Sequence, residues 1–360
     1  MPSLSTQHSV LNSPPQRIVL ILPCCIGDVI LATPTLMALR RAYPQAHITW
    51  AVGTWSKGVI EHHPLLDAVI DTGSQALPVK SVGGFFKFVR QIRAGHFDLA
   101  VSLVRSPLMS AALFLSGIPH RAGLDSAGRG FGYTIRAPID PNKPRHEADI
   151  YLDVPRALGL DVSGRIANVP VTPEDTASVK SELTQAGITS RFIVINPTGG
   201  RNPGMTMDSK RWPPANFAQL ANRLAKSLNT KIVLFGGPND GDIVNAVAEN
   251  LDQPPTTFVG KLSFGQIAAL ASLSHLYIGN DTGMTHLAAA SGARTVMILG
   301  PSDPTRYAPF TPKSLALWRP TQVNQRGVAG GTELNWDWVR DGISVNEAEA
   351  KIKAFVEDET

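Results

Sequence analysis

Short apolar runs alternate with amphipathic segments in the first half of the chain. Residues 84–93 place Phe85, Phe88 and Ile92 on one face of a helix, with basic residues largely opposite, and residues 34–43 form a second helical segment. The apolar runs are rich in β-branched residues and predict strands over residues 17–22, 47–52, 68–70 and 98–103. Apolar strands separated by helices are typical of a buried parallel sheet that helices cover.

The second half of the chain repeats this alternation more clearly. Its apolar runs predict strands over residues 192–196, 231–235, 257–259, 276–279 and 295–299. The segments between them predict helices over residues 214–228, 242–250, 264–273 and 284–291. We therefore predict an α/β protein with two Rossmann-like domains, each a doubly wound parallel sheet, which face each other across a central cleft.

The segment between the two halves has no strong strand pattern until its end. Thr172-Pro173 within it is typical of a capped helix start. Near the C-terminus, residues 344–356 predict a charged amphipathic helix that packs on one of the domains. The predicted organisation is a disordered tail, a first domain, a linker, a second domain and a C-terminal helical segment, at residues 1–16, 17–165, 166–190, 191–335 and 336–360.

Composition supports a globular protein. Of the 360 residues, 43% are hydrophobic and 17% are charged, enough for a sizeable core. Two charge-free apolar stretches, residues 106–119 and 262–280, are interrupted by polar residues. Neither reaches the ~20 mostly apolar residues of a membrane-spanning helix. The N-terminal residues lack the basic start and apolar core of a signal peptide, so we do not expect export.

Charge and cysteine usage narrow the classes of partner. The 33 Lys and Arg residues exceed the 29 Asp and Glu residues only mildly, which suits an anionic ligand or a membrane surface. No motif of nucleic-acid-binding proteins accompanies the excess, so we expect no nucleic-acid partner. The two cysteines, Cys24 and Cys25, are adjacent. Because adjacent cysteines rarely pair, we predict neither a disulfide nor a four-cysteine zinc site, as is typical of a cytoplasmic protein.

Ligands of doubly wound sheets bind beyond the carboxyl ends of the strands, so the loops after the strands carry the candidate chemistry. The loop after the first strand holds Cys25, Gly27 and Asp28 at the start of a helix. Asp28 is either a helix cap or a carboxylate at the mouth of the predicted cleft. The loop lacks the Gly-x-Gly-x-x-Gly pattern, so it does not predict dinucleotide binding.

Two loops of the second half combine glycines with charged residues. Thr198 and Arg201 follow one strand, and Lys210 comes shortly after them. Hydroxyl, backbone and cationic donors together suit phosphate, although a solvated basic loop has the same composition. Asp240 or Asp242 follows the next strand and is either a ribose contact or a helix cap.

The loop after the strand at 276–279 is the most informative. Asp281-Thr282-Gly283 leads into an alanine-rich helix, whose free N–H groups and positive end suit a pyrophosphate. His286 lies one turn into that helix. Its side chain either donates a hydrogen bond to a phosphate oxygen or has only a structural role.

These motifs resemble those of glycosyltransferase family 9, the lipopolysaccharide heptosyltransferases. The resemblance rests on Asn-Asp-Thr-Gly-Met-Thr-His-Leu-Ala-Ala at 280–289, followed by Gly-Pro-Ser-Asp-Pro at 300–304. Further motifs match in the expected order: Ile-Gly-Asp-Val-Ile-Leu-Ala-Thr-Pro at 26–34, Arg-Ala-Gly at 121–123, Lys-Arg-Trp-Pro at 210–213 and Phe-Gly-Gly-Pro at 235–238. The resemblance covers about residues 17–355.

The resemblance implies a GT-B architecture, with the acceptor mainly on the first domain and the nucleotide sugar mainly on the second. It implies an inverting transfer, most often of heptose from ADP-heptose to a lipid-A-linked inner core, without a cofactor or a required metal. Asp28 then matches the general base. Lys210, Thr198 and Arg201 are expected at the donor phosphates, and the pyrophosphate cradle matches Thr282, Gly283 and His286.

The remaining candidates belong to the nucleotide and to the acceptor. Asp240 and Asp281 are expected near the nucleotide and its ribose. The acceptor-side candidates are Cys25, Gly27, Arg105 and Ser106. The chain departs from the family in two places, with Cys24-Cys25 where a small polar residue is usual and Ser102 where the strand often continues to an Asp.

We expect a monomer at the cytoplasmic face of the inner membrane. Lys87 and Arg90 beside Phe86 suit contact with anionic lipid, although an ordinary amphipathic helix has the same pattern. Two other functions stay open. One is a related GT-B enzyme, such as a nucleotide-sugar epimerase or a transferase with another donor. The other is a non-catalytic nucleotide-sugar-binding protein, against which the joint presence of Asp28, Lys210 and His286 argues.

Overall fold

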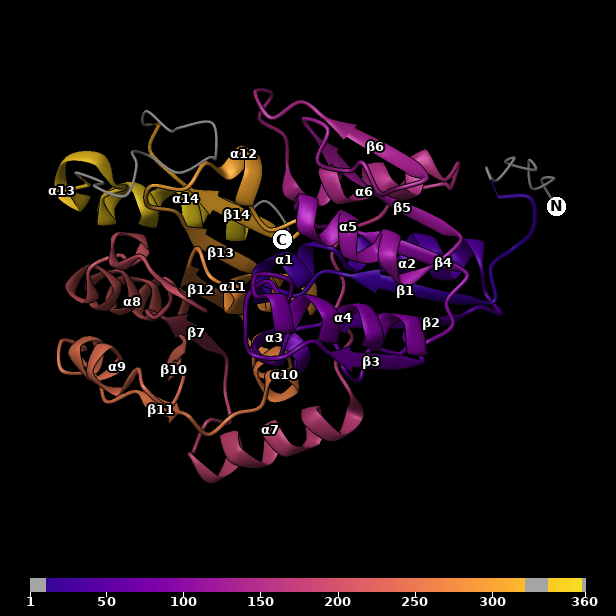
Figure 1. Ribbon diagram of the computed structural model, residues 1–360. Helices are drawn as coiled ribbons and strands as arrows, with labels where there is room; N and C mark the ends of the chain where they lie inside the picture. Colours follow the sequence, from indigo (N-terminus) through magenta and orange to yellow (C-terminus); the bar gives the residue numbers. More distant parts are fainter. Residues whose placement is uncertain (1–10, 321–335, 358–360) are drawn as a thin grey trace, which may run out of the picture. The chain divides into compact units, whose positions relative to one another are not determined.

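The computed structural model describes residues 11–320 and 336–357. The chain divides into two compact units, one ending at Ala167 and the other beginning at Asn168. Each unit is built around its own six-stranded parallel sheet (Figure 1). This confirms the predicted fold class, an α/β protein with two Rossmann-like sheets. The division falls inside the segment that was predicted to be a linker.

The sheet of the first unit has the strand order β3-β2-β1-β4-β5-β6. Strand β1 pairs in parallel with both β2 and β4, so the strand order changes direction between β1 and β4. The loops that follow these two strands therefore leave the sheet side by side. The strands are β1 (Arg17–Ile21), β2 (His47–Val52), β3 (Ala68–Asp71), β4 (Leu99–Ser102), β5 (His120–Ser126) and β6 (Ile135–Ile139).

Helices cover both faces of this sheet. Phe88 and Ile92 on one helix and Met109 and Leu113 on another pack with the strand residue Val19 in a buried cluster. The helices are α1 (Ile26–Leu31), α2 (Thr33–Ala42), α3 (Thr54–Lys57), α4 (Val82–Ala94), α5 (Pro107–Ser116) and α6 (Glu147–Ala157). Helix α6 packs against α1 and α2.

The sheet of the second unit has the strand order β11-β10-β7-β12-β13-β14. Its strands are β7 (Phe192–Asn196), β10 (Lys231–Gly236), β11 (Thr256–Val259), β12 (Leu276–Asn280), β13 (Thr295–Ile298) and β14 (Ser314–Leu317), with a small hairpin of β8 (Arg201–Asn202) and β9 (Met205–Thr206). Here the strand order changes direction between β7 and β12, which again brings two loops together.

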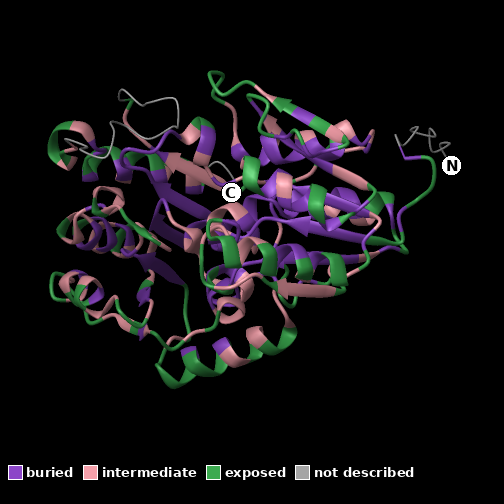
Figure 2. Ribbon diagram, viewed as in Figure 1, coloured by how far each residue is buried: buried purple, intermediate pink, exposed green. Residues whose placement is uncertain are grey.

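The second unit also has helices on both faces of its sheet. They are α7 (Pro173–Gln185), η1 (Asp208–Lys210), α8 (Pro214–Leu228), α9 (Gly241–Ala248), α10 (Phe264–Leu273), α11 (Gly283–Ala290), α12 (Pro304–Tyr307), α13 (Trp338–Asp341) and α14 (Val345–Glu357). Helix α7 begins at the predicted cap Thr172 and packs on α10. Its outward face is mostly exposed, whereas the central strands are buried (Figure 2).

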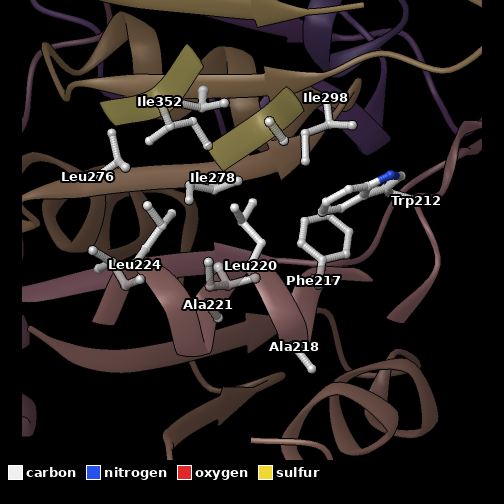
Figure 3. Close-up of a cluster of buried hydrophobic side chains, with 14 of the residues drawn as sticks. Trp212, Phe217, Ala218, Leu220, Ala221, Leu224, Leu276, Ile278, Ile298 and Ile352 are labelled. Carbon is white, nitrogen blue, oxygen red and sulfur yellow. The ribbon is translucent and has the colours of Figure 1, made fainter. Parts of the chain in front are cut away.

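The core of the second unit includes the C-terminal helix. Figure 3 shows Phe217 and Leu220 of α8 facing Ile278 of β12, with Ile352 of α14 in the same cluster. The predicted C-terminal helix therefore packs on the second unit, against α8. Trp212 is fully buried beside Phe217, with the ring centroids 5.1 Å apart.

One part of the predicted disordered tail needs correction. Residues 1–10 lie outside the described part of the chain, but residues 11–16 are described and Leu11 is buried. The backbone N–H of Gln16 donates to Asp98 Oδ2 at 2.8 Å, which ties this segment to the start of β4. Among the described helices, none has both the length and the apolar character needed to cross a membrane.

Candidate functional site

Asp28 lies where β1 leads into α1. It is the third residue of α1, and its Oδ2 accepts a hydrogen bond from the Cys25 backbone N–H at 3.2 Å. Asp28 thus takes part in capping α1 as the N3 residue of a capping box, while the N-cap position itself is Cys25. The second carboxylate oxygen, Oδ1, accepts a hydrogen bond from the Tyr151 hydroxyl at 2.8 Å. Tyr151 belongs to α6 and is buried, so Asp28 is fixed by groups from two helices.

The surroundings of Asp28 favour its protonated form. Burial and the negative charge of Glu147 raise the pKa of Asp28, while the hydrogen bonds from Cys25 and Tyr151 and the charge of Arg105 oppose that rise. Burial and the charge of Asp28 in turn raise the pKa of Tyr151 well above 10. Tyr151 is therefore a neutral hydroxyl donor at ordinary pH, and Asp28 is a carboxylate with increased basicity.

Arg105 comes from the loop after β4, next to the loop that carries Asp28. Its guanidinium Nη2 donates to Glu147 Oε2, and Glu147 is 3% exposed at the first position of α6. Burial lowers the pKa of Arg105, but the charge of Glu147 and the hydrogen bond to it raise that pKa overall. Glu147 and Tyr151 were not predicted as site residues from the sequence.

A pocket of about 220 Å³ opens at this cluster, and Cys24, Asp28, Arg105 and Tyr151 are among its lining residues. The structure thus brings together the predicted base and Arg105, one of the acceptor-side candidates. Of the other acceptor-side candidates, Gly27 is the second residue of α1 and Ser106 is the N-cap of α5, beside Arg105 in the chain.

The prediction that Cys24 and Cys25 remain unpaired is wrong. The two sulfur atoms form a disulfide, with the Cα atoms 3.0 Å apart across a cis peptide bond. The prediction rested on how seldom adjacent cysteines pair in general, which does not determine the geometry of one particular turn. Cys25 precedes α1 as its N-cap residue, so the disulfide lies next to Asp28.

In the second unit, Asn280 joins three of the predicted segments. Its side-chain Nδ2 donates to the carbonyls of Pro197 and Thr198 at 2.9 and 3.0 Å, and its Oδ1 accepts from the Trp212 N–H at 2.9 Å. Asn280 is fully buried at the end of β12. It therefore holds the loop after β7 and the segment after Lys210 against the loop before α11. Sequence reasoning did not select it, although it opens the motif at 280–289.

Lys210 and Asp281 form a mostly buried ion pair. The Lys210 Nζ lies 2.6 Å from Asp281 Oδ2. Although burial raises the pKa of Asp281, the charges of Lys210 and His286 lower it overall. The carboxylate of Asp281 is thus directed at Lys210, the lysine that was predicted at the donor phosphates.

The N-terminus of α11 carries the predicted phosphate cradle. Thr282 is the N-cap residue, and its hydroxyl accepts from the Thr285 N–H. Gly283 is the first helical residue, and His286 is buried one turn further on. Gly199, after β7, passes so close to this helix that a Cβ there would lie 2.0 Å from Thr282 Cγ2. The two predicted phosphate loops are therefore in direct contact.

The remaining donor-side candidates lie near these loops. Thr198 is buried, and its hydroxyl donates to Asn196 Oδ1 at 2.7 Å. Arg201, in β8, is half exposed, with its Nη1 3.7 Å from Asp240 Oδ1. The other oxygen of Asp240 accepts a hydrogen bond from the Gly237 N–H at 2.9 Å, which stabilises the loop that follows β10. The structure therefore places Arg201 and Asp240 side by side.

The comparisons with known proteins identify the family of the chain. The chain belongs to glycosyltransferase family 9 (heptosyltransferase), whose model matches residues 85–334. It is thus a glycosyltransferase of this family.

Curated relatives and solved structures span most of the chain. It is 24% identical over 298 residues to lipopolysaccharide heptosyltransferase 3 of Escherichia coli, covering 81% of this chain and 86% of the relative. It is similar to a family 9 glycosyl transferase structure from Veillonella parvula DSM 2008, with a TM-score of 0.81 and 27% identity over 95% of this chain and 98% of that one. The E. coli ADP-heptose lps heptosyltransferase II structure shares the fold, with a TM-score of 0.73 and 21% identity over 95% and 99% of the two chains.

Proposed function

We propose that this chain transfers heptose from ADP-heptose to a lipopolysaccharide inner-core acceptor, with inversion at the anomeric carbon. Membership of family 9 supports sugar transfer, and the names of the relatives supply the donor and acceptor classes. The observation that carries the catalytic part of the proposal is Asp28. It is a carboxylate of raised pKa that lines a pocket at the carboxyl end of β1.

On the acceptor side, Asp28 acts as the general base. An acceptor hydroxyl attacks the anomeric carbon while its proton passes to the Asp28 carboxylate. The new C–O bond forms as the bond to the ADP oxygen breaks, and the electron pair of that bond leaves with ADP. A single displacement of this kind inverts the configuration. Arg105, Ser106, Cys25 and Gly27 are proposed as acceptor-side residues around the base.

On the donor side, the second unit stabilises the charge of the departing ADP. The Lys210 ammonium, the N–H groups at Thr282 and Gly283, and the imidazole of His286 are proposed to bind the diphosphate. Lys210 is supported in this role because Asp281 holds its side chain in place. Thr198 and Arg201 are proposed to contribute further phosphate contacts. The leaving group is thereby neutralised by the chain's own groups, so we propose that no metal or other cofactor is required.

The ribose contact is proposed to be Asp240. Its position beyond β10, next to the glycines of the loop, suits a hydroxyl pair of a nucleotide. Because Asp281 is turned toward Lys210, we propose Asp281 as the residue that orients the phosphate-binding lysine.

We also propose that the enzyme works as a monomer at the cytoplasmic face of the inner membrane. The apolar side chains Phe88 and Ile92 of α4 enter the core, as expected of an ordinary amphipathic helix. However, Phe86 is 55% exposed, and Lys87 and Arg90 are exposed next to it. An exposed aromatic ring flanked by cations suits the surface of an anionic bilayer, where a lipid-linked acceptor is found.

The proposed function is tested by following ADP release and the mass of the glycan product. The purified chain is incubated with a lipid-linked inner-core acceptor and, in turn, with ADP-heptose and other nucleotide sugars. The proposal predicts that ADP-heptose gives the fastest ADP release and adds one heptose mass to the acceptor. Transfer from a different nucleotide sugar alone would contradict the donor assignment. Release of ADP without acceptor modification would contradict transfer itself.

A further inference from the structure

Three side chains that sequence reasoning did not connect converge on Asp28. Tyr151 and Glu147 lie one helical turn apart on α6, and Arg105 reaches Glu147 from the loop after β4. The Tyr151 hydroxyl donates to Asp28 Oδ1 at 2.8 Å, across a separation of 123 residues in the chain. Tyr151 and Glu147 are both nearly inaccessible to solvent.

We propose that Tyr151 is the residue that orients the Asp28 carboxylate, and that Glu147 and Arg105 form a charge pair that adjusts its strength as a base. This inference rests on the proposed function, because it assigns Asp28 as the general base. Tyr151, Glu147 and Arg105 are positioning residues here, since each acts through Asp28.

The hydrogen-bond geometry carries the first half of the proposal. A carboxylate rotates freely about its last bond unless both oxygens are held. In Asp28, the Cys25 N–H holds Oδ2 and the Tyr151 hydroxyl holds Oδ1. Each oxygen retains a second lone pair, so the group is fixed in direction and can still accept a proton. The buried Tyr151 ring provides a rigid support for this arrangement.

The charges of Glu147 and Arg105 support the second half of the proposal, which concerns the strength of Asp28 as a base. Glu147 places a second negative charge near Asp28, which strengthens the tendency of Asp28 to take up a proton. Arg105 donates a hydrogen bond to Glu147, and its positive charge lowers the pKa of Asp28. The net effect of burial and these charges is a raised pKa, so Asp28 is a stronger base than an exposed Asp, and Arg105 limits that rise.

Other charged residues on the elements packed against α1 are engaged elsewhere. Helices α2, α3 and α6 contact α1. The groups of these helices and of the β4 loop that act on Asp28 are Tyr151, Glu147 and Arg105. The remaining charged residues of α2 and α3 form the pairs Arg40 with Asp67, Arg41 with Asp161 and Lys57 with Glu61. Those of α6 pair with each other or with Arg145: Asp153 with Arg145 and Arg156, and Asp149 with Arg156.

The proposal predicts opposite shifts in the pH profiles of two variants. Tyr151→Phe removes a hydrogen bond to the ionised form, so the pKa of Asp28 rises and the acid limb of the rate profile moves to higher pH. Glu147→Gln removes a negative charge but keeps an oxygen that can accept from Arg105, so the acid limb moves to lower pH. Below neutral pH, Tyr151→Phe is expected to lose about tenfold or more in rate.

The experiment measures single-turnover sugar transfer as a function of pH, at saturating donor, for the wild type and both variants. Tyr133→Phe is the matched control. Tyr133 is also a buried tyrosine of the first unit, but its hydroxyl donates to Ser102 Oγ at 2.9 Å and does not reach Asp28. The control is expected to leave the acid limb in its wild-type position. Thermal unfolding of each variant shows whether it folds. If Tyr151→Phe fails to fold, the shift of the acid limb in Glu147→Gln decides the test.

Acid limbs that stay in place in both variants, or that move in the same direction, would overturn this inference. An Asp28→Asn variant measured in parallel separates that result from failure of the proposed function. If Asp28→Asn is active, the assignment of the base is wrong. If Asp28→Asn is inactive while the limbs do not move, only the positioning roles are wrong.

Discussion

The Lys210 ammonium and the Asp281 carboxylate lie 2.6 Å apart between the η1 turn and the start of α11. Lys210 is 18% exposed and Asp281 is 7% exposed. A pair this shielded from water is oriented more strongly than a surface ion pair, because its partners have few alternatives. Lys210 is therefore held next to the N–H groups of α11, where the donor diphosphate is proposed to bind.

Replacing Lys210 is expected to weaken the binding of ADP. Lys210→Ala removes one charged partner of the diphosphate, which costs about 1.5–3 kcal/mol of binding free energy, and His286→Ala is expected to act in the same direction. Calorimetric titration with ADP measures both effects. Lys226→Ala, on the exposed side of α8 in the same unit, is the control and is expected to bind ADP normally. Unchanged affinity in both site variants would remove these residues from the donor site.

Asp281 is expected to make the stability of the protein depend on acid pH. Lys210 and His286 hold the folded-state pKa of Asp281 below 3.8, so the ionised group stabilises the fold above about pH 4. That contribution is lost as the pH falls through the lower, folded-state value. Asp281→Asn is expected to be less stable at neutral pH, by on the order of 3 kcal/mol, and to lose less stability on acidification.

Urea unfolding at a series of pH values measures this dependence. Asp242→Asn is a suitable control because Asp242 is exposed at the start of α9. Parallel curves of unfolding free energy against pH for the wild type and Asp281→Asn would show that the ion pair has no such role.

The contact between Gly199 and Thr282 predicts that a single methyl group disrupts the donor site. Gly199 has a φ of 125°, and an added Cβ would lie 2.0 Å from Thr282 Cγ2. Gly199→Ala is therefore expected to displace the start of α11 and to weaken ADP binding. Gly204→Ala is the matched control, because Gly204 also has a positive φ, of 76°, but open space around it. Equal ADP affinity in the two variants would contradict the steric argument.

The exposed face of α4 predicts binding to anionic membranes. Vesicles containing anionic lipid are expected to carry the wild type upward in a flotation gradient, and neutral vesicles are not. Lys87→Glu/Arg90→Glu reverses two exposed charges beside Phe86 and is expected to abolish flotation without affecting thermal stability. If the variant floats as well as the wild type, α4 is not the contact surface.

The sequence pattern predicts the central strands well because they are buried on both faces. Phe192–Asn196, for example, forms β7 over the predicted residues, and all five residues are buried. The pattern is weaker toward the edge of the first sheet. Strand β5 contains His120, Arg121 and Asp125, and β6 contains Pro138, so neither reads as a continuous apolar run and neither was predicted.

The candidate site was only partly predictable for a related reason. Asp28 and the loops at Thr198 and Thr282 stand out because they follow strands that the pattern predicts, and Lys210 lies further along the same connection as Thr198. Tyr151 does not, since it lies on α6, a helix that contains Pro155 and was not predicted. Only the packing of α6 against α1 brings Tyr151 to Asp28. The apolar spacing of Ile150, Val154 and Leu158 was the one available signal for this helix.

The most direct test of the account is the single-turnover rate of Asp28→Asn. Asparagine keeps an oxygen that can accept from the Cys25 N–H, so the helix cap is preserved and the melting temperature is expected to change little. Because the amide cannot take up the acceptor proton, the rate is expected to fall by about 10²–10⁴-fold while ADP affinity stays normal. An Asp28→Asn enzyme that transfers sugar at a rate near that of the wild type would contradict the assignment of Asp28 as the general base.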